Sequence, residues 1–276
     1  MLSIVIPTYN SALNLKELIL RIYKSVKDFE LIFVDDNSTD DTLEILRRLT
    51  RKLPELKVIS LSRNFGQQMA STCGLKYSKG EAVIIMDDDL QDPPEVLPML
   101  IHKWKEGYDV VYAVRNRKDN KFLYTLFYKL FNKISYQKIP LDSGDFGLMS
   151  RRVVDILADM PEHSRLLRGL RAWVGFRQAS IVYDRPLRKM GKTGYNWLKV
   201  GQFVMYSLLA FSNMPLYLSF VFSFICIILY LFIHNIVLIC TSMLLFCLGI
   251  LGKYIIRITD EVNQRPLYLI KERINI

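Results

Sequence analysis

The first 113 residues alternate short apolar runs with amphipathic segments, and this alternation limits the fold more than any other feature of the chain. Short runs rich in Val and Ile are typical of buried strands. They are found at residues 2–6, 30–34, 56–61, 82–86 and 110–113. After the first run, Leu15, Leu18 and Ile22 recur at helical spacing, and Leu43 and Leu46 do the same after the second. Strands that alternate with helices predict an α/β domain with a mostly parallel sheet and flanking helices.

The region after residue 113 is more varied. Residues 119–137 combine basic and aromatic side chains in a helical pattern, which favours an amphipathic helix at the lipid headgroups, with an ordinary core helix as the alternative. Residues 150–175 are expected to be helical and residues 179–183 to form a strand. We therefore place a catalytic domain at residues 1–184, followed at 185–207 by a basic loop and an interfacial amphipathic helical segment.

Two long apolar runs at residues 211–233 and 236–256 each have the roughly 20 residues needed to cross a bilayer. Only His234 and Asn235 separate them, so both flanks must lie on one side of the membrane. Lys199 before the first run, and several basic residues at and after the second, place that side in the cytoplasm by the positive-inside rule. The sequence thus predicts a two-helix transmembrane hairpin within residues 208–258 and a cytoplasmic tail at 259–276. The protein would be a multi-pass protein of the cytoplasmic (inner) membrane, with its catalytic domain and both termini in the cytoplasm; buried helices of a soluble protein are the alternative.

The charge and the cysteines narrow the class of protein. A formal net charge of +10 favours anionic partners, and next to membrane segments these are expected to be membrane lipids and phosphorylated substrates, with no nucleic acid. Of the four cysteines, three lie in the apolar region and Cys73 stands alone. Neither a disulfide framework nor a Cys-x-x-Cys metal site is therefore expected.

The strongest chemical signal is the sequence Asp-Asp-Asp-Leu-Gln-Asp-Pro-Pro at residues 87–94, directly after the apolar run 82–86. Open α/β sheets bind ligands at the carboxyl ends of their strands. Alternate carboxylates there can hold a hard divalent cation such as Mg²⁺ or Mn²⁺, which takes oxygen ligands and shares them with substrate phosphates. Such an ion neutralises the charge that develops on a leaving nucleoside diphosphate. A solvated acidic turn is the alternative.

A second acidic turn, Asp-Asp-Asn-Ser-Thr-Asp at residues 35–40, ends the second strand candidate in the same way. Both acidic turns should therefore meet on one edge of the sheet, where one carboxylate would bind a nucleobase or a ribose hydroxyl. Because Asp, Asn and Ser often precede helices as caps, helix capping by Ser38 or Thr39 is the alternative. Tyr9 closes the first strand and could stack on a base.

These motifs, together with Ile-Val-Ile-Pro-Thr-Tyr-Asn at 4–10, Leu-Ser-Arg-Asn-Phe-Gly at 61–66, Gly-Asp-Phe-Gly-Leu at 144–148 and Arg-Gly-Leu-Arg-Ala-Trp-Val-Gly-Phe at 168–176, resemble the family 2 glycosyltransferases of the GT-A fold. Within that family the chain is most similar to polyprenyl-phosphate glycosyltransferases, the group of bactoprenol glucosyltransferase and dolichyl-phosphate mannose synthase. The resemblance extends over nearly the whole chain.

The resemblance implies a role for each matching position. Nucleotide-sugar binding would fall to Pro7, Tyr9, Asp35, Asp36, Asp87 and Asp88. Asp87, Asp89 and Gln91 would hold the metal, and Asp89 and Asp145 would be the catalytic carboxylates. The acceptor phosphate would meet Arg115, Arg117, Arg188 and Lys192, for which plain membrane-surface charge is the alternative. A structural or orienting role is the alternative for Asp145, because a phosphate monoester needs little deprotonation at neutral pH.

The expected reaction is an inverting transfer of a hexose from a nucleotide diphosphate sugar to polyprenyl (undecaprenyl) phosphate, for modification of a surface polysaccharide or glycan. UDP-glucose is the first expectation for the donor, and UDP-linked amino or N-acetyl sugars and GDP-mannose follow it. A processive polysaccharide synthase would need more spans and a Gln-x-x-Arg-Trp motif, which the sequence lacks. A non-catalytic membrane scaffold is the alternative from another functional class. The resemblance also allows this chain to form a homo-oligomer.

Overall fold

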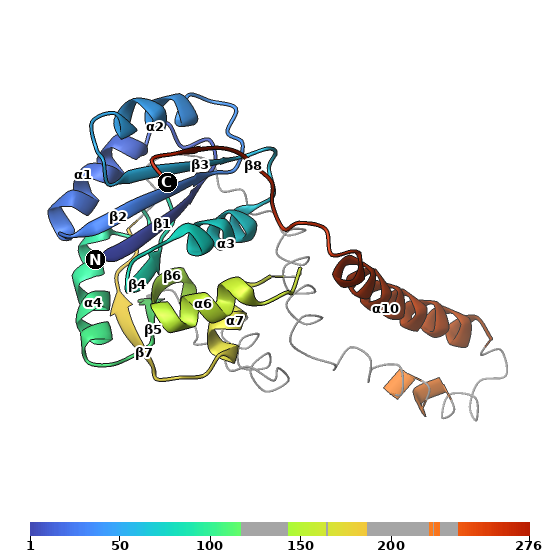
Figure 1. Ribbon diagram of the computed structural model, residues 1–276. Helices are drawn as coiled ribbons and strands as arrows, with labels where there is room; N and C mark the ends of the chain where they lie inside the picture. The colour runs from blue at the N-terminus through green and yellow to red at the C-terminus, as the bar shows by residue number, and fades with distance from the viewer. Residues whose placement is uncertain (117–142, 164, 187–220, 223, 227–236) are drawn as a thin grey trace.

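A computed structural model describes residues 1–116, 143–163, 165–186, 221–222, 224–226 and 237–276. These residues form an eight-stranded sheet with the order β7-β5-β6-β4-β1-β2-β3-β8, covered by helices (Figure 1). The elements are β1 (Leu2–Thr8), α1 (Leu15–Ser25), β2 (Phe29–Asp35), α2 (Thr42–Thr50), β3 (Leu56–Leu61), α3 (Gln67–Tyr77), β4 (Ala82–Ile85), the 3-10 helix η1 (Pro94–Val96), α4 (Leu97–Lys105), β5 (Val110–Arg115), β6 (Ser143–Ser150), α6 (Arg151–Asp159), α7 (Leu167–Trp173), β7 (Gln178–Tyr183), α10 (Val237–Asn263) and β8 (Ile270–Ile274).

The predicted α/β sheet is confirmed, although its strands are mixed in direction. β4, β1, β2 and β3 run parallel to one another, and β5 pairs in parallel with β7. β6 is antiparallel to both β4 and β5, and β8 is antiparallel to β3. The five predicted apolar runs match β1 to β5, and the predicted strand at 179–183 matches β7. β6 and β8 were not predicted as strands.

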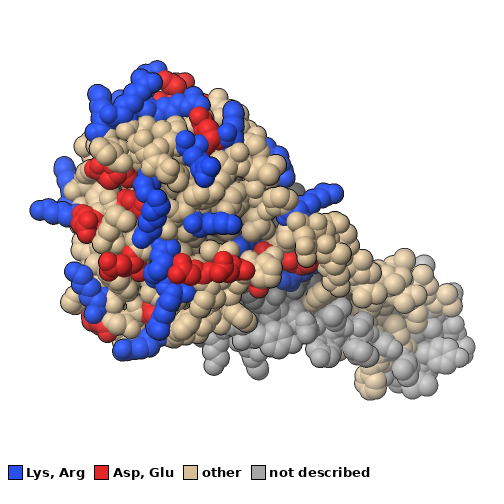
Figure 2. Space-filling view, in the orientation of Figure 1, with Lys and Arg blue, Asp and Glu red and all other residues tan. Residues whose placement is uncertain are grey.

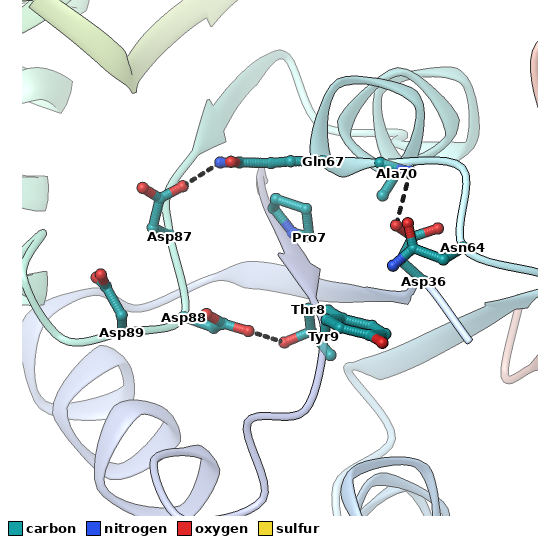
Figure 3. A pocket seen from close by; sticks show the side chains of 11 residues that line it. Pro7, Thr8, Tyr9, Asp36, Asn64, Gln67, Ala70, Asp87, Asp88 and Asp89 are labelled. Carbon is teal, nitrogen blue, oxygen red and sulfur yellow. Dashed lines mark hydrogen bonds between the residues drawn. The ribbon is translucent and has the colours of Figure 1, made fainter. Parts of the chain in front are cut away.

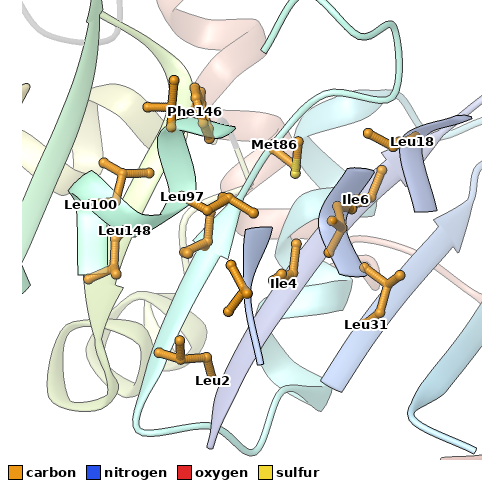
Figure 4. Packing of buried hydrophobic residues seen from close by; sticks show 14 of the residues in the cluster. Leu2, Ile4, Ile6, Leu18, Leu31, Met86, Leu97, Leu100, Phe146 and Leu148 are labelled. Atoms are coloured by element: carbon orange, nitrogen blue, oxygen red, sulfur yellow. The ribbon is translucent and has the colours of Figure 1, made fainter. Parts of the chain in front are cut away.

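The central strands are buried on both faces, which explains their nearly continuous apolar sequences. On β1, Ile4 and Ile6 pack against α1 and α4, whereas Val5 between them faces the layer of α3. Phe33 and Val34 of β2 divide between the two faces in the same way. Figure 4 shows part of the apolar layer that contains Ile4 and Ile6. The two apolar layers hold the carboxyl ends of the parallel strands in fixed positions.

The helices differ from the sequence-based expectation in two places. The helical region predicted at 150–175 consists of two helices, α6 and α7, with an irregular segment between them. The expected cap of α2 by Ser38 or Thr39 is wrong, because α2 begins at Thr42 and it is Asp40 Oδ1 that accepts the Thr42 N–H, at 3.0 Å.

The long helix α10 projects from the α/β body (Figure 1), and Figure 2 shows mostly uncharged side chains along it. Leu244, Leu245 and Phe246 are each more than half exposed. Phe222 packs edge-on against Phe246, with 5.5 Å between the ring centroids, and Cys226 Sγ lies 3.1 Å from Met243 Sδ. Among the helices built from described residues, none combines the length and apolarity of a bilayer span. Most of the predicted first span and the predicted helix at 119–137 lie outside the described residues.

Candidate active site

A cavity of about 350 Å³ opens at the carboxyl ends of β1, β2 and β4. It lies where open α/β sheets bind their ligands. In Figure 3 the loop that carries Asp87, Asp88 and Asp89 stands on one side of the β1 end, with Asp36 and Asn64 on the other. The cavity is lined by residues from the end of β1 and just after it, the loops after β2, β3 and β4, and the start of α3: Pro7, Thr8, Tyr9, Asp36, Asn64, Gly66, Gln67, Ala70, Asp87, Asp88 and Asp89.

The acidic loop after β4 is fastened to the loop after β1. Asp88 Oδ2 accepts hydrogen bonds from the hydroxyls of Thr8 and Ser11, each at 2.6 Å. Burial raises the pKa of Asp88, although these two hydrogen bonds act in the opposite direction. Leu90 has a left-handed backbone (φ 60°), which is rare for a residue with a branched side chain. Its buried side chain packs into the core, so packing holds the loop in this conformation.

Asp87 and Asp89 face the cavity and are the described residues best placed to hold a cation. Asp87 Oδ1 accepts a hydrogen bond from Gln67 Nε2 at 2.6 Å, and Asp89 Oδ1 accepts the N–H of Gln91 at 3.1 Å. Burial and the repulsion of neighbouring carboxylates, first of all Asp92, raise the pKa of Asp87 well above its usual value. A divalent cation would offset this repulsion, so the donor set fits a metal.

The geometry limits which metal chemistry the site could support. Within the described residues, no group of three His, Cys, Asp or Glu side chains forms a ready cage for an ion. Mg²⁺ does not require one, because it is usually held by one or two carboxylates, waters and substrate phosphates. Gln91, the third predicted ligand, does not line the cavity.

The two carboxylates after β2 occupy different environments. Asp36 lines the cavity, and its oxygens accept the backbone N–H groups of Phe65 at 2.7 Å and Gly66 at 2.8 Å, immediately before α3. Burial raises the pKa of Asp36 despite these bonds. Asp35 lies beneath the cavity, fully buried, where Oδ2 accepts a hydrogen bond from the Ser60 hydroxyl at 3.1 Å. Asp36 thus both borders the cavity and fixes the loop that enters α3.

Pro7 and Tyr9 line the cavity between the acidic loop and Asp36 (Figure 3). Pro7 belongs to β1 and is buried, whereas Tyr9 follows the strand and is 48% exposed. An exposed aromatic ring beside a carboxylate-lined cavity can stack on a nucleobase. The structure thus places both predicted nucleotide-contacting residues at the same site as the acidic loop.

Asp145, on β6, lies in a hydrogen-bond network that the sequence did not predict. Gln68 Nε2 donates to Oδ2 of Asp145 at 2.7 Å, and the guanidinium of Arg168 lies 3.3 Å from both of its oxygens. Burial alone would raise the pKa of Asp145, but Arg168, Arg171 and the hydrogen bonds hold it below the usual value. Asp145 is therefore an ionised carboxylate at neutral pH. Gln68 follows the motif at 61–66 and Arg168 begins the motif at 168–176, but the sequence alone assigns neither of them a role.

One of the four basic residues predicted to meet a phosphate is described. Arg115, at the end of β5, is partly buried, and its charge acts on Asp92 and Asp87. Arg117, Arg188 and Lys192 lie outside the described residues, so their predicted roles stay predictions.

The comparisons with known proteins agree with this geometry. The sequence profile of glycosyl transferase family 2 matches residues 3–157. The chain is 38% identical to the uncharacterized glycosyltransferase YkcC of Bacillus subtilis, over 99% of this chain and 94% of that protein. It is 36% identical to the bactoprenol glucosyl transferase of Shigella phage SfX, over 99% of each chain.

Solved structures show the same fold at lower identity. The mannosyltransferase PcManGT from Pyrobaculum calidifontis, in complex with GDP-Man and Mn²⁺, matches with a TM-score of 0.52 at 22% identity, over 75% of this chain and 62% of that one. Glucosyl-3-phosphoglycerate synthase from Mycobacterium tuberculosis also gives 0.52, at 20% identity, over 75% of this chain and 79% of that one. The chain has the GT-A fold and belongs to glycosyltransferase family 2, a family of transferase enzymes.

Proposed function

We propose that the protein transfers a hexose, with glucose from UDP-glucose as the first choice, to the phosphate of a polyprenyl lipid such as undecaprenyl phosphate. The observation that carries this proposal is the cavity in which Tyr9, Asp36 and the Asp87–Asp89 loop meet at the ends of three parallel strands. The choice of sugar and lipid is supported by the full-length similarity to proteins named bactoprenol glucosyl transferase.

The proposed reaction is a single displacement at the anomeric carbon. An oxygen of the lipid phosphate forms the new bond to that carbon, the bond to the donor diphosphate breaks, and the nucleoside diphosphate leaves with the electron pair. Because the second pKa of a phosphate monoester is near 6, the acceptor is mostly a dianion at neutral pH and no strong base is required. In-line attack inverts the configuration of the anomeric carbon. The protein therefore contributes mainly by positioning the two substrates and stabilising the leaving diphosphate.

Asp87 and Asp89 would hold Mg²⁺ or Mn²⁺, and that cation, when bound, neutralises the negative charge that develops on the leaving diphosphate. Asp88 has a different task, because its hydrogen bonds to Thr8 and Ser11 orient the loop. Asp36 and Tyr9 would contact the nucleoside. Asp87 and Asp89 would thus share the metal, whereas Asp88 and Asp36 would have separate roles.

We assign Asp145 an orienting role. Its oxygens already accept hydrogen bonds from Gln68 and Arg168, and it is ionised at neutral pH. A carboxylate held in this way is a weak proton acceptor, but it can fix the position of Arg168 and of the start of α7. This role agrees with an acceptor that arrives already deprotonated.

We also propose that residues 208–258 form a membrane hairpin that brings the domain to the cytoplasmic face, where the lipid phosphate lies. Three observations support this: the two apolar runs with basic flanks, the exposed apolar side chains of α10, and the contact of Phe222 with Phe246 between the two runs. An enzyme whose acceptor is a membrane lipid needs its site close to the bilayer.

The test is transfer of radiolabelled sugar from UDP- and GDP-linked donors to undecaprenyl phosphate by detergent-purified full-length protein with Mg²⁺ or Mn²⁺. We expect metal-dependent label in the lipid fraction from UDP-glucose, with activity reduced by a factor of roughly 10³ or more in Asp89→Ala. Asp155→Ala is the matched control, because Asp155 is exposed on α6 and pairs only with Arg151 in the described contacts. Label from GDP-mannose alone would replace the donor, and unchanged transfer by Asp89→Ala would refute the site.

A further inference from the structure

Asp92 is a buried carboxylate for which the proposed reaction has no use. It ends the acidic loop and is fully inaccessible to solvent. Its Oδ1 accepts the Tyr183 hydroxyl at 2.7 Å, and its Oδ2 lies 3.4 Å from the backbone nitrogen of Asp87. A buried carboxylate is costly unless it is paired and hydrogen-bonded. Its partners show that it joins the metal-binding loop to the end of β7.

Two cations act on Asp92, Arg115 and, less strongly, Arg185. The guanidinium of Arg115 interacts with the Tyr183 hydroxyl, which itself donates a hydrogen bond to Asp92. Burial would lower the pKa of Arg115, but the attraction of Asp92 and the contact with Tyr183 raise it. Arg115, Tyr183 and Asp92 therefore form one connected group of a cation, a hydroxyl and a buried anion.

The guanidinium of Arg115 packs closely against the backbone of β6. A Cβ on Gly144 would lie 2.9 Å from Arg115 Nη2, so the glycine allows the close approach. Tyr183 is itself fixed by an edge-on contact with Phe146, with 5.6 Å between the ring centroids. The buried Nε of Arg115 has no hydrogen-bond partner among the described atoms. The cation is thus held near Asp87 with donor capacity remaining.

We propose that Tyr183 and Asp92 are positioning residues that hold Arg115 where it binds a substrate phosphate. The inference rests on the proposed function, since only a phosphate-containing substrate gives the cation a task. Guanidinium groups suit phosphate because they offer several N–H donors in a fixed plane. The phosphate belongs either to the donor diphosphate or to the lipid acceptor, and the two sources can be separated by experiment.

The test uses Tyr183→Phe, which removes the hydroxyl and keeps the ring against Phe146. Its matched control is Tyr23→Phe, because the Tyr23 hydroxyl also donates to a carboxylate, Glu55, at 2.5 Å, far from the cavity. Transfer is measured while the donor and the lipid phosphate are varied separately, and binding of UDP and GDP with Mn²⁺ is measured by titration. Arg115→Ala and the double variant with Tyr183→Phe complete a cycle.

We expect Tyr183→Phe to raise the KM for one substrate about tenfold, as the loss of one hydrogen bond to a charged group would, with kcat less affected. A raised KM for the donor with weaker UDP binding assigns the diphosphate, and a raised KM for the lipid assigns the acceptor. Tyr183→Phe should add no further loss to Arg115→Ala. Equal KM values in Tyr183→Phe and wild type, the same loss in Tyr23→Phe, or additive losses in the cycle would overturn the inference. If the wild type binds UDP or GDP without transferring sugar to lipid, the acceptor proposal fails and the UDP and GDP titrations of the variants still decide the inference.

Discussion

Replacing Gln68 by Ala should destabilise the protein more than its partial exposure would indicate, because this side chain joins three elements. From α3, Nε2 donates to Asp145 of β6 at 2.7 Å, and Oε1 accepts the N–H of Leu167 at the start of α7, at 2.9 Å. A hydrogen bond to a charged group contributes about 1.5–3 kcal/mol, and a buried N–H left without a partner costs about 1–3 kcal/mol. Since such terms are not additive, we expect the free energy of unfolding to fall by about 2–4 kcal/mol.

The assay is thermal unfolding of the detergent-purified protein, followed by intrinsic fluorescence, and the expected fall in Tm is roughly 5–15 °C. Gln67→Ala is the matched control, because Gln67 is the adjacent residue of α3, is exposed, and bonds only Asp87 among the described contacts. It should change the free energy of unfolding by no more than about 0.5 kcal/mol. If the two variants lose equal stability, the hydrogen bonds of Gln68 to Asp145 and Leu167 do not stabilise the fold.

Three other perturbations test separate parts of the structure. Burial would raise the pKa of Glu30, but hydrogen bonds from Lys57 and other donors lower it. The ionised Glu30 therefore stabilises the fold at pH values above its unfolded-state pKa of about 4.3, and this stabilisation is lost as the pH falls through the pKa of Glu30 in the folded state. Glu30→Gln should therefore lower Tm at pH 7, and its difference in Tm from the wild type should shrink as the pH falls below about 4.3. A difference in Tm that is independent of pH would contradict this. Gly80→Ala should cost about 1–3 kcal/mol in urea or thermal unfolding, because its Cβ would lie 2.5 Å from the backbone nitrogen of Ser3, and unchanged stability would show that the strand ends can move apart. Asn275→Ala should lower Tm by a few degrees, about 1–2 kcal/mol, because Nδ2 donates to two backbone carbonyls that lose their partner; a Tm equal to wild type would exclude a role for this contact.

The sequence predicts the parallel part of the fold well, because strands buried on both faces must be apolar along their whole length. β6 and β8 carry no such pattern. β6 includes Ser-Gly-Asp-Phe-Gly, and its strand conformation depends on pairing with β4 and β5, which lie on either side of it. β8 has three consecutive charged residues between Ile270 and Ile274, and it pairs with β3, which lies far away in the sequence. Both segments form strands because they pair with distant parts of the chain, and such pairing cannot be predicted from the local sequence.

The candidate site, like the fold, could be predicted from the sequence only in part. Carboxylates placed after strands could be assigned to one edge of the sheet, and the structure brings Asp36 and the Asp87–Asp89 loop together there. The distinct environment of each carboxylate could not be predicted. Asp88 bonds two hydroxyls and Asp35 lies below the cavity, because these positions depend on how neighbouring loops cross. The partners of Asp145 come from two helices that only tertiary packing brings together.

The C-terminal segment explains how the site can be held at a fixed orientation relative to α10. After α10 the chain returns to the sheet as β8, and Glu272 forms an ion pair with Arg47 of α2. At the end of α10, Glu261 accepts the backbone N–H of His163 at 2.9 Å, and the carbonyl of Arg265 lies 2.5 Å from His163 Nε2. These contacts fasten one end of α10 to the same α/β body that carries the cavity. If α10 lies in the bilayer as proposed, these contacts keep the cavity at a fixed distance from the lipid phosphates. A lipid acceptor that stays in the membrane would then remain within reach of the site.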